Sequence, residues 1–174
     1  MSVLSVMKKL FLTTAVGLSL LFAQGCYTLS GISVDPSVST FAVRTFDNIA
    51  PNAPPTLAVD FTERLKDKVR RETRLTLNGD SPDIEFSGKI TDYRVVPVAP
   101  KPNEVVSLNR LEIRVRVGLL NNKDEKKSWT NERDFSFFAE FSNTTDLLSV
   151  QDALIQTISN QLLEDIFNAA FNDW

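Results

Sequence analysis

An alternation of apolar and charged residues from Arg110 to Val117, continued by Leu119 after Gly118, is the clearest pattern in the chain. Alternation with a period of two is typical of a β-strand that buries one face and leaves the other uncovered. The apolar set is Leu111, Ile113, Val115, Val117 and Leu119, and the opposite set is Arg110, Glu112, Arg114 and Arg116. The pattern therefore predicts a sheet with one face against a core and one face uncovered.

Three further segments have the composition of strands. Residues 39–46 are rich in aromatic and β-branched side chains. A second alternation starts at Ile84, and its change of phase at Tyr93, together with Gly88, indicates a β-bulge. A fourth strand is expected where one face is shared by Trp129, Phe135 and Phe137, with Asn131 and Arg133 as its imperfect members.

Two segments follow a helical period instead. From Pro55 the apolar residues recur at steps of four, which predicts a helix that extends to about Leu75. Asp146 can cap a second, longer helix near the end of the chain. The apolar stripes are Leu57, Phe61, Leu65 and Val69 in the first helix, and Val150, Leu154, Ile158, Leu162, Ile166 and Phe171 in the second.

The expected elements follow one another in the order β, α, β, β, β, α. Because each helix has one apolar side, both can cover the same face of the sheet. The sequence therefore predicts an α+β fold of two layers. We expect a four-stranded, mostly antiparallel sheet with two helices packed on one face.

A proline-rich segment, VPVAPKPN, lies between the second and third expected strands, at residues 96–103. Its three prolines exclude it from a central strand. Together with Val95 just before it, the apolar residues Val96, Val98 and Ala99 expose more apolar surface than the end of a hairpin requires. Two interpretations stay open, namely a loop that contacts a partner and an extension of the second strand.

The first 25 residues have the layout of a secretory signal peptide, with Lys8 and Lys9 ahead of an apolar run over residues 10–23. This run is shorter than the roughly 20 residues of a membrane span. Residues 1–6 add nothing to the layout, so Met7 is an alternative start of translation. We expect a lipoprotein signal peptide over residues 1–25.

Cys26 is the single cysteine of the chain and directly follows this segment. It cannot form an internal disulfide, and a chain without histidine lacks the usual partner of a catalytic thiol. The residues Ala23, Gln24, Gly25 and Cys26 resemble a bacterial lipobox, in which the cysteine is lipidated. We predict a lipidated tether over residues 26–37 and a single domain over residues 38–174; the other interpretation is a buried thiol behind an uncleaved anchor.

Charge and composition argue against several classes of function. The net charge is −3, and loss of residues 1–25, which hold two lysines and no acid, would make it two units more negative. Domains that bind nucleic acid are typically basic, so we expect no nucleic-acid partner. Absence of histidine removes Ser-His-Asp and Cys-His arrangements and the commonest metal ligand. We therefore expect a non-enzymatic protein with no cofactor and no metal.

Charge is also unevenly distributed. Six lysines and arginines lie between Arg64 and Arg74, whereas every charged residue after Arg133 is an acid. The basic side of the first helix is either solvated or paired with the acidic final helix. Asp80 and Asp83, which flank Ser81 and Pro82, are typical of an ordinary turn.

Five segments together resemble the LptE family, specifically its Bacteroidetes branch. They are CYTLSG (26–31), TFAVRTFDN (40–48), FTERLKDKVR (61–70), SLNRLEIRVRV (107–117) and IFNAAFNDW (166–174). The resemblance implies an outer-membrane lipoprotein that is anchored on the periplasmic side and occupies the lumen of the LptD β-barrel as a heterodimer. It also implies a role in barrel assembly and in delivery of lipopolysaccharide to the outer leaflet.

The resemblance further implies that basic residues of the sheet contact lipopolysaccharide or the barrel. The candidates are Lys89, Arg110, Arg114 and Arg116, whose guanidinium and ammonium groups suit phosphate. The other interpretation is that they only keep a sheet face soluble, and Glu112 among them would neutralise part of their charge. A rival function is that of an auxiliary lipid-binding lipoprotein of an ABC-type lipid transporter, with a soluble ligand cleft.

Overall fold

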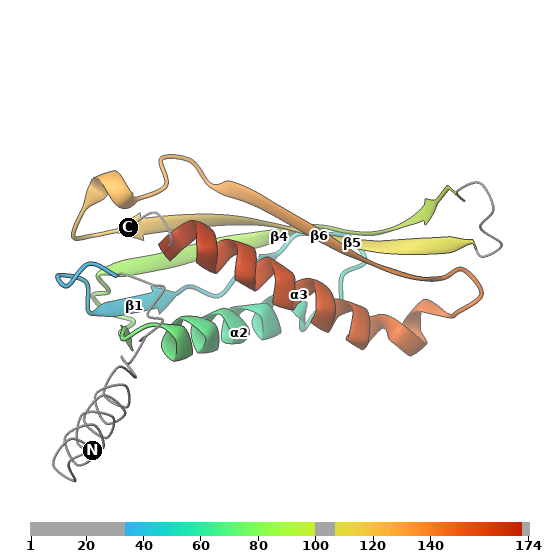
Figure 1. Ribbon diagram of the computed structural model, residues 1–174, viewed down its shortest axis with the longest axis horizontal. Coiled ribbons are helices and arrows are strands. Elements are labelled where there is room, and N and C mark those ends of the chain that lie inside the picture. The colour runs from blue at the N-terminus through green and yellow to red at the C-terminus, as the bar shows by residue number, and fades with distance from the viewer. Residues whose placement is uncertain (1–33, 100–106, 172–174) are drawn as a thin grey trace, which may run out of the picture. The chain divides into compact units, whose positions relative to one another are not determined.

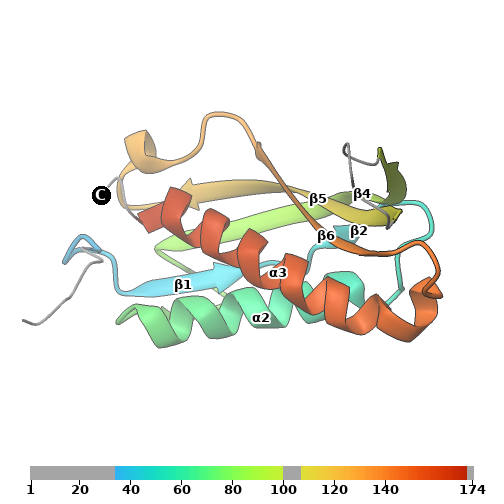
Figure 2. The ribbon, with the colours of Figure 1, turned by 45° about the vertical axis from the view of Figure 1, so that its right-hand side comes forward.

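The computed structural model describes residues 34–99 and 107–171. The elements are β1 (Thr40–Val43), β2 (Asp47–Asn48), α2 (Leu57–Glu72), β3 (Thr76–Leu77), β4 (Ile84–Val98), β5 (Leu108–Asn121), η1 (Glu125–Lys127), β6 (Arg133–Ser142) and α3 (Leu147–Phe171). Figures 1 and 2 show both long helices on the same side of the sheet. The expected signal peptide and Cys26 lie outside the described residues.

The sheet is mixed, with six strands in the order β3-β1-β4-β5-β6, and β2 pairs with β4. β1 runs parallel to β3 and β4, whereas β4–β5 and β5–β6 are antiparallel. The α+β class is confirmed, but the expected four-stranded sheet and its element order are wrong in detail. β2 and β3 are two residues long, too short for a periodic pattern. The parallel pairing follows from α2, which returns the chain in the direction of β1.

A β-bulge interrupts β4, as expected. The register with β5 shifts between Ile90 and Asp92, so that Ile90 and then Tyr93 face the core. Gly88 has a different role from the one expected. A Cβ atom at this position would lie 2.5 Å from Cε1 of Phe46 and 2.6 Å from the carbonyl oxygen of Arg116. Only glycine therefore fits beneath the Phe46 ring.

The start of the proline-rich segment belongs to the sheet. β4 continues through Pro97 to Val98, which pair with Asn109 and Leu108. Among the described residues, this end of β4 has β5 on one side and no strand on the other, so the missing N–H of Pro97 costs no ladder bond. Of the two open interpretations, strand extension is therefore confirmed for Val96 and Val98, and Ala99 follows directly after the strand.

The core lies between the sheet and the two helices. All five apolar residues of the alternation in β5 are buried, and so are the four of the stripe in α2. In α3 the stripe is buried from Leu154 onward, and Val150 packs against the core while partly buried. Phe171 of α3 contacts Phe86 of β4, with 6.1 Å between ring centroids. The expected periodicities are confirmed.

Two element ends differ from expectation. α2 ends at Glu72, short of Leu75, because Thr73 adopts an extended conformation and its hydroxyl donates to the carbonyl oxygen of Val69 at 2.7 Å. The last strand begins only at Arg133, so that Trp129 and Asn131 precede it. Trp129 still reaches the core side, where its ring lies 5.9 Å from that of Phe135.

Asp83 joins three segments at one end of the sheet. Its carboxylate accepts hydrogen bonds from the backbone N–H of Ser39 at 2.8 Å and of Thr40 at 3.0 Å, and lies 3.2 Å from Nζ of Lys123. These bonds, the one from Ser39 first, hold the pKa of Asp83 well below its ordinary value of 3.8 despite its burial. The residue does more than an ordinary turn residue, because it fixes the start of β1 against β4.

Candidate functional site

The four basic residues singled out in the sequence lie on the face of the sheet that no helix covers. Lys89 comes from β4 and the three arginines come from β5, where they alternate with the buried set. Lys89 is directly opposite Arg116 in the β4–β5 register. The alternation of the two strands thus places the four side chains on one surface, as expected.

Each of these basic residues has a carboxylate partner on the same face. Arg116 donates to both oxygens of Asp134 on β6, with Nε–Oδ1 at 2.7 Å and Nη2–Oδ2 at 3.0 Å. Arg110 contacts Glu140 at 2.8 Å, and Lys89 contacts Glu132 at 3.2 Å. The Arg116–Asp134 hydrogen bonds lower the pKa of Asp134 and raise that of Arg116.

Arg114 has the loosest pairing of the four. Its guanidinium lies 3.6 Å from Glu112, and both carboxylate oxygens of Glu112 already accept hydrogen bonds from Arg94 at 3.1 Å. Exposed ion pairs contribute little to stability, because water competes for both partners. The face is therefore charge-balanced rather than a basic patch, and Arg114 is the arginine that can exchange its partner most easily.

A small groove brings together two sets of residues that the sequence presents separately. It has a volume of about 220 Å³ and is lined by Val96, Pro97, Val98 and Ala99 of β4 and its end, and by Arg110 of β5. Val96 and Arg110 are direct neighbours in the register, which explains why they meet. The groove therefore combines an apolar wall with one guanidinium group.

The Arg110 guanidinium is held in place from two sides. Its central carbon lies 3.6 Å from the centroid of the Phe138 ring, and Nη2 donates to Glu140 at 2.8 Å. Its Nε is buried and has no hydrogen-bond partner. A buried donor without a partner is costly, so an acceptor at this position would be bound favourably. The groove is suited to an amphiphile with an anionic group next to an apolar part.

Sequence reasoning missed Phe138, whose ring packs against the Arg110 guanidinium of this groove. It lies on the outer face of β6, out of phase with Phe135 and Phe137, and its exposed fraction is 39%. A large apolar residue in the polar phase of an alternating strand was the available signal. The β5–β6 register places Arg110 opposite Glu140. Phe138 lies two residues before Glu140 on the same face of β6, and this brings its ring next to Arg110.

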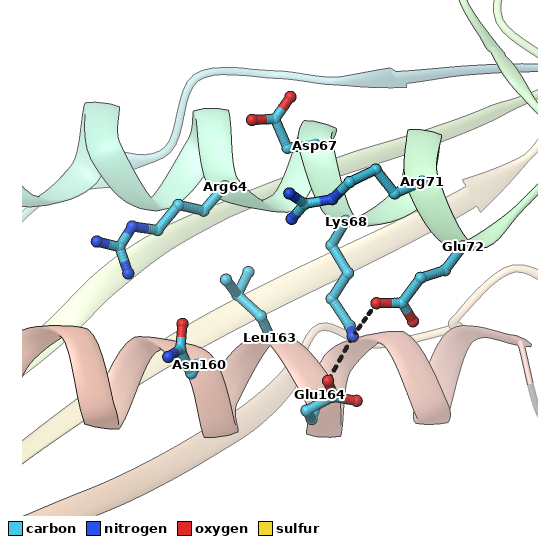
Figure 3. A pocket seen from close by; sticks show the side chains of 8 residues that line it. All are labelled: Arg64, Asp67, Lys68, Arg71, Glu72, Asn160, Leu163 and Glu164. Carbon is cyan, nitrogen blue, oxygen red and sulfur yellow. Dashed lines mark hydrogen bonds and ion pairs between the residues drawn. The ribbon is translucent and has the colours of Figure 1, made fainter.

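A second hollow, of about 470 Å³, lies between α2 and α3 (Figure 3). Lys68 extends from α2 toward α3, and its Nζ lies 2.7 Å from Glu72 and 2.6 Å from Glu164. Pairing of the first helix with the acidic final helix, one of the two interpretations, is therefore confirmed for Lys68. Lys66 and Arg70 instead pair within α2, at 2.7 Å each.

Lys68 serves helix packing rather than ligand binding. Burial acts to lower the pKa of its amine, but the hydrogen bonds that the amine donates to Glu164 and Glu72 outweigh burial, and the pKa is raised. The amine also lies 4.9 Å from the ring centroid of Phe167. The amine thus binds two carboxylates of the protein itself, which leaves the sheet face as the better candidate site.

The described residues offer neither a metal site nor a membrane-spanning helix. Residues 34–99 and 107–171 contain no group of three or more cysteine, aspartate or glutamate side chains placed to hold a metal ion. In the same residues, neither helix has the length and apolar character needed to cross a membrane.

The described residues define an α+β domain with two helices on one face of a mixed sheet and a charge-paired, uncovered opposite face. A sequence model of the LptE lipopolysaccharide-assembly family matches residues 38–170. The chain therefore belongs to the LptE family, as its sequence predicted. Its place in the Bacteroidetes branch stays a prediction. No curated protein sequence matches the chain.

Several solved lipoprotein structures are similar to the chain at low sequence identity. A minor lipoprotein from Acinetobacter baumannii is 12% identical, with a TM-score of 0.46, covering 75% of this chain and 90% of that chain. The rare lipoprotein B from Shewanella oneidensis is 7% identical, with a TM-score of 0.47 and the same two coverages, 75% and 90%. An uncharacterized lipoprotein B from Nitrosomonas europaea is 12% identical, with a TM-score of 0.44, covering 74% of this chain and 79% of that chain.

Proposed function

We propose that the chain is a non-catalytic outer-membrane lipoprotein, anchored through Cys26 on the periplasmic side. Its domain occupies the lumen of the LptD β-barrel as a heterodimer, supports assembly of the barrel and assists delivery of lipopolysaccharide to the outer leaflet. The observation that carries this proposal is the match of the LptE lipopolysaccharide-assembly family to residues 38–170.

The uncovered sheet face is the proposed contact surface for lipopolysaccharide or for the barrel. It includes Lys89, Arg110, Arg114 and Arg116, with Val96, Val98 and Ala99 along the groove. Phosphate competes well for a guanidinium because it presents oxygens in the geometry of the guanidinium fork. The groove around Arg110 supports the proposal best, since its guanidinium lies beside an apolar wall that matches an acylated ligand.

A pull-down from native membranes in mild detergent tests the partner. Tagged protein is expected to recover one large outer-membrane β-barrel protein in equal amount, identified by mass spectrometry as LptD. Recovery of an ABC transporter instead would favour the rival function of an auxiliary lipid-binding lipoprotein. Recovery of the protein alone would contradict the proposal that the domain occupies the LptD barrel.

Binding of purified lipopolysaccharide to the full-length protein tests the contact surface. Arg110→Ala and Arg114→Glu are each expected to weaken binding by about 10- to 100-fold, the range for loss of one charged hydrogen bond. Arg116→Glu is expected to weaken it less, because Arg116 is engaged in two short hydrogen bonds with Asp134. The matched control is Arg70→Ala, which removes an arginine paired within α2. Equal weakening by the control would contradict a specific surface.

A further inference from the structure

β6 forms an outer edge of the sheet. The strand order ends at β6, and its partner on the inner side is β5. Within the described parts of the chain, no strand pairs with its other side. α3 contacts β6 and lies with α2 on the helix side of the sheet (Figure 2). The backbone groups along the edge are therefore available to a further strand.

The register identifies which amide groups point outward. The N–H of Asn143 donates to the carbonyl oxygen of Ser107 at 3.1 Å, which continues the uninterrupted β5–β6 ladder. In an antiparallel ladder alternate residues point their N–H groups to opposite sides. The residues in phase with Asn143 therefore donate to β5, and the outward donors are Asp134, Ser136, Phe138 and Glu140.

This edge has only part of the usual protection against pairing. Natural edge strands are commonly blocked by charged side chains, proline, a bulge or short length, and of these β6 has only the charged Arg133, Asp134 and Glu140. The ten residues of β6, RDFSFFAEFS, contain four phenylalanines and neither proline nor lysine, and the ladder with β5 has no register shift. Such an open strand is a template for association with another strand. An edge of this kind indicates a partner that covers it.

We propose that a β-strand of a partner protein adds to the outer edge of β6. The four outward-donor positions carry two acids and no base; Asp134 and Glu140 pair with Arg116 and Arg110 but keep exposed fractions of 46% and 36%. Antiparallel pairing with a second β6 centred on Phe137 would place these acids opposite one another, which favours a partner strand with basic residues on the outer face over a second copy of this chain. Strand addition supplies affinity through main-chain hydrogen bonds and specificity through alternate side chains.

The inference goes beyond the proposed function, because it concerns how this chain holds a partner and does not require that the partner is LptD. It is therefore tested with a defined probe. The probe is a decapeptide of alternating valine and lysine, and its control is the same peptide with every backbone amide methylated, so that neither of its edges can donate hydrogen bonds. Both carry the same charge, but only the first can form a full edge ladder.

Hydrogen exchange of the full-length protein, with and without peptide, gives the readout. The outward amides are expected to exchange quickly in the protein alone and at least about tenfold more slowly with the unmethylated peptide, while the inward amides of Phe135 and Phe137 stay protected in both states. Equal protection by the methylated peptide would indicate charge binding only and overturn the proposal. Protection that rises with protein concentration without peptide would overturn it in favour of a second copy.

Ser136→Pro supplies the matched variant. It removes one outward donor at an exposed position without removing a bond to β5, which proline permits at a sheet edge. Ser136→Ala keeps the donor and is the control. The proline variant is expected to lose most peptide-induced protection, and the alanine variant to keep it. Unchanged protection in the proline variant would overturn the proposal. If Ser136→Pro does not fold, the comparison of the methylated and unmethylated peptides on the wild-type protein tests the proposal by itself.

Discussion

The two faces of β5 are built from the same ten consecutive residues but by different rules. On the core face, the side chains from Leu111 to Leu119 have exposed fractions of 0–3%. On the outer face, Arg110, Arg114 and Arg116 each lie within reach of a carboxylate from β5 or β6. Burial of apolar area specifies the first face, whereas pairwise charge balance specifies the second.

The difference indicates where this fold can change its function without losing its stability. Removing a buried side chain leaves a cavity in a closely packed interior, and the neighbours relax only in part. Removing an exposed ion-pair partner leaves a group that water can solvate. A contact surface on the outer face is therefore compatible with the rigid core behind it.

The largest expected effect is that of Ile113→Ala, at the centre of the core face. Ile113 is 1% exposed, and the truncation is expected to lower the free energy of unfolding by about 2–5 kcal/mol. Urea unfolding measures it. The matched control is Arg114→Ala at the next position of the same strand, which should lie close to the wild-type protein. Similar losses for both variants would contradict the division of β5 into two faces.

Asp83→Ala is expected to cause the next largest loss in the free energy of unfolding, although Asp83 lies at the end of the sheet. The truncation leaves the N–H groups of Ser39 and Thr40 without their acceptor, at a cost of about 1.5–3 kcal/mol. Urea unfolding at neutral pH measures this cost. Asp80→Ala, an exposed neighbour, is the control. No loss for Asp83→Ala would show that β1 holds its position through packing alone.

The same carboxylate predicts a pH dependence. The pKa of Asp83 is lower in the folded protein than its ordinary value of 3.8, chiefly through the hydrogen bond from Ser39. Its contribution is therefore present above pH 3.8 and is lost as the pH falls toward the folded pKa, because the unfolded chain takes up the proton first. Acid unfolding followed by circular dichroism should be shallower in Asp83→Asn than in the wild-type protein. Parallel acid transitions would contradict this assignment.

Gly88→Ala tests how closely β4 packs against the Phe46 ring and against the backbone of β5 at Arg116. The added Cβ would clash with the ring of Phe46 and with the carbonyl oxygen of Arg116, and overpacking of this kind costs about 1–3 kcal/mol. Thermal unfolding measures it. The control is Gly79→Ala, where no atom lies within 4 Å of the new Cβ. Equal melting temperatures for the two variants would show that the sheet accommodates a Cβ atom at Gly88 more easily than its contacts indicate.

Periodicity predicted the long elements and missed the short ones for physical reasons. The apolar stripes of α2 and α3 and the alternation of β5 each repeat several times, so each indicates its buried face unambiguously. β2 and β3 are held by pairing with distant strands rather than by a local pattern. The rule that excludes proline from central strands holds for Pro97, because at its position β4 is an edge, but the rule does not say whether an edge strand forms there.

The candidate site was predictable in its location and not in its pairing. The phase of the alternation places Arg110, Arg114 and Arg116 on the uncovered face, and this needs only the sequence. Their acidic partners on β6 depend on the register between strands about 20–30 residues apart in the chain, as for Arg116–Asp134 and Arg110–Glu140. Register is set by the hairpin connection and the bulges, which local propensity does not specify.

The smallest expected effect on stability is that of Arg116→Ala. Arg116 makes the best ion-pair geometry on the outer face, yet it is 42% exposed, and water can solvate Asp134 when the arginine is removed. The melting temperature is expected to fall by less than about 4 °C, and by less still at high salt, where the wild-type pair is already screened. Thermal unfolding at low and high salt measures both. A loss as large as that of Ile113→Ala would mean that the ion-pair ladder is a structural element in its own right, and that replacing its carboxylates by phosphate on ligand binding would destabilise the domain.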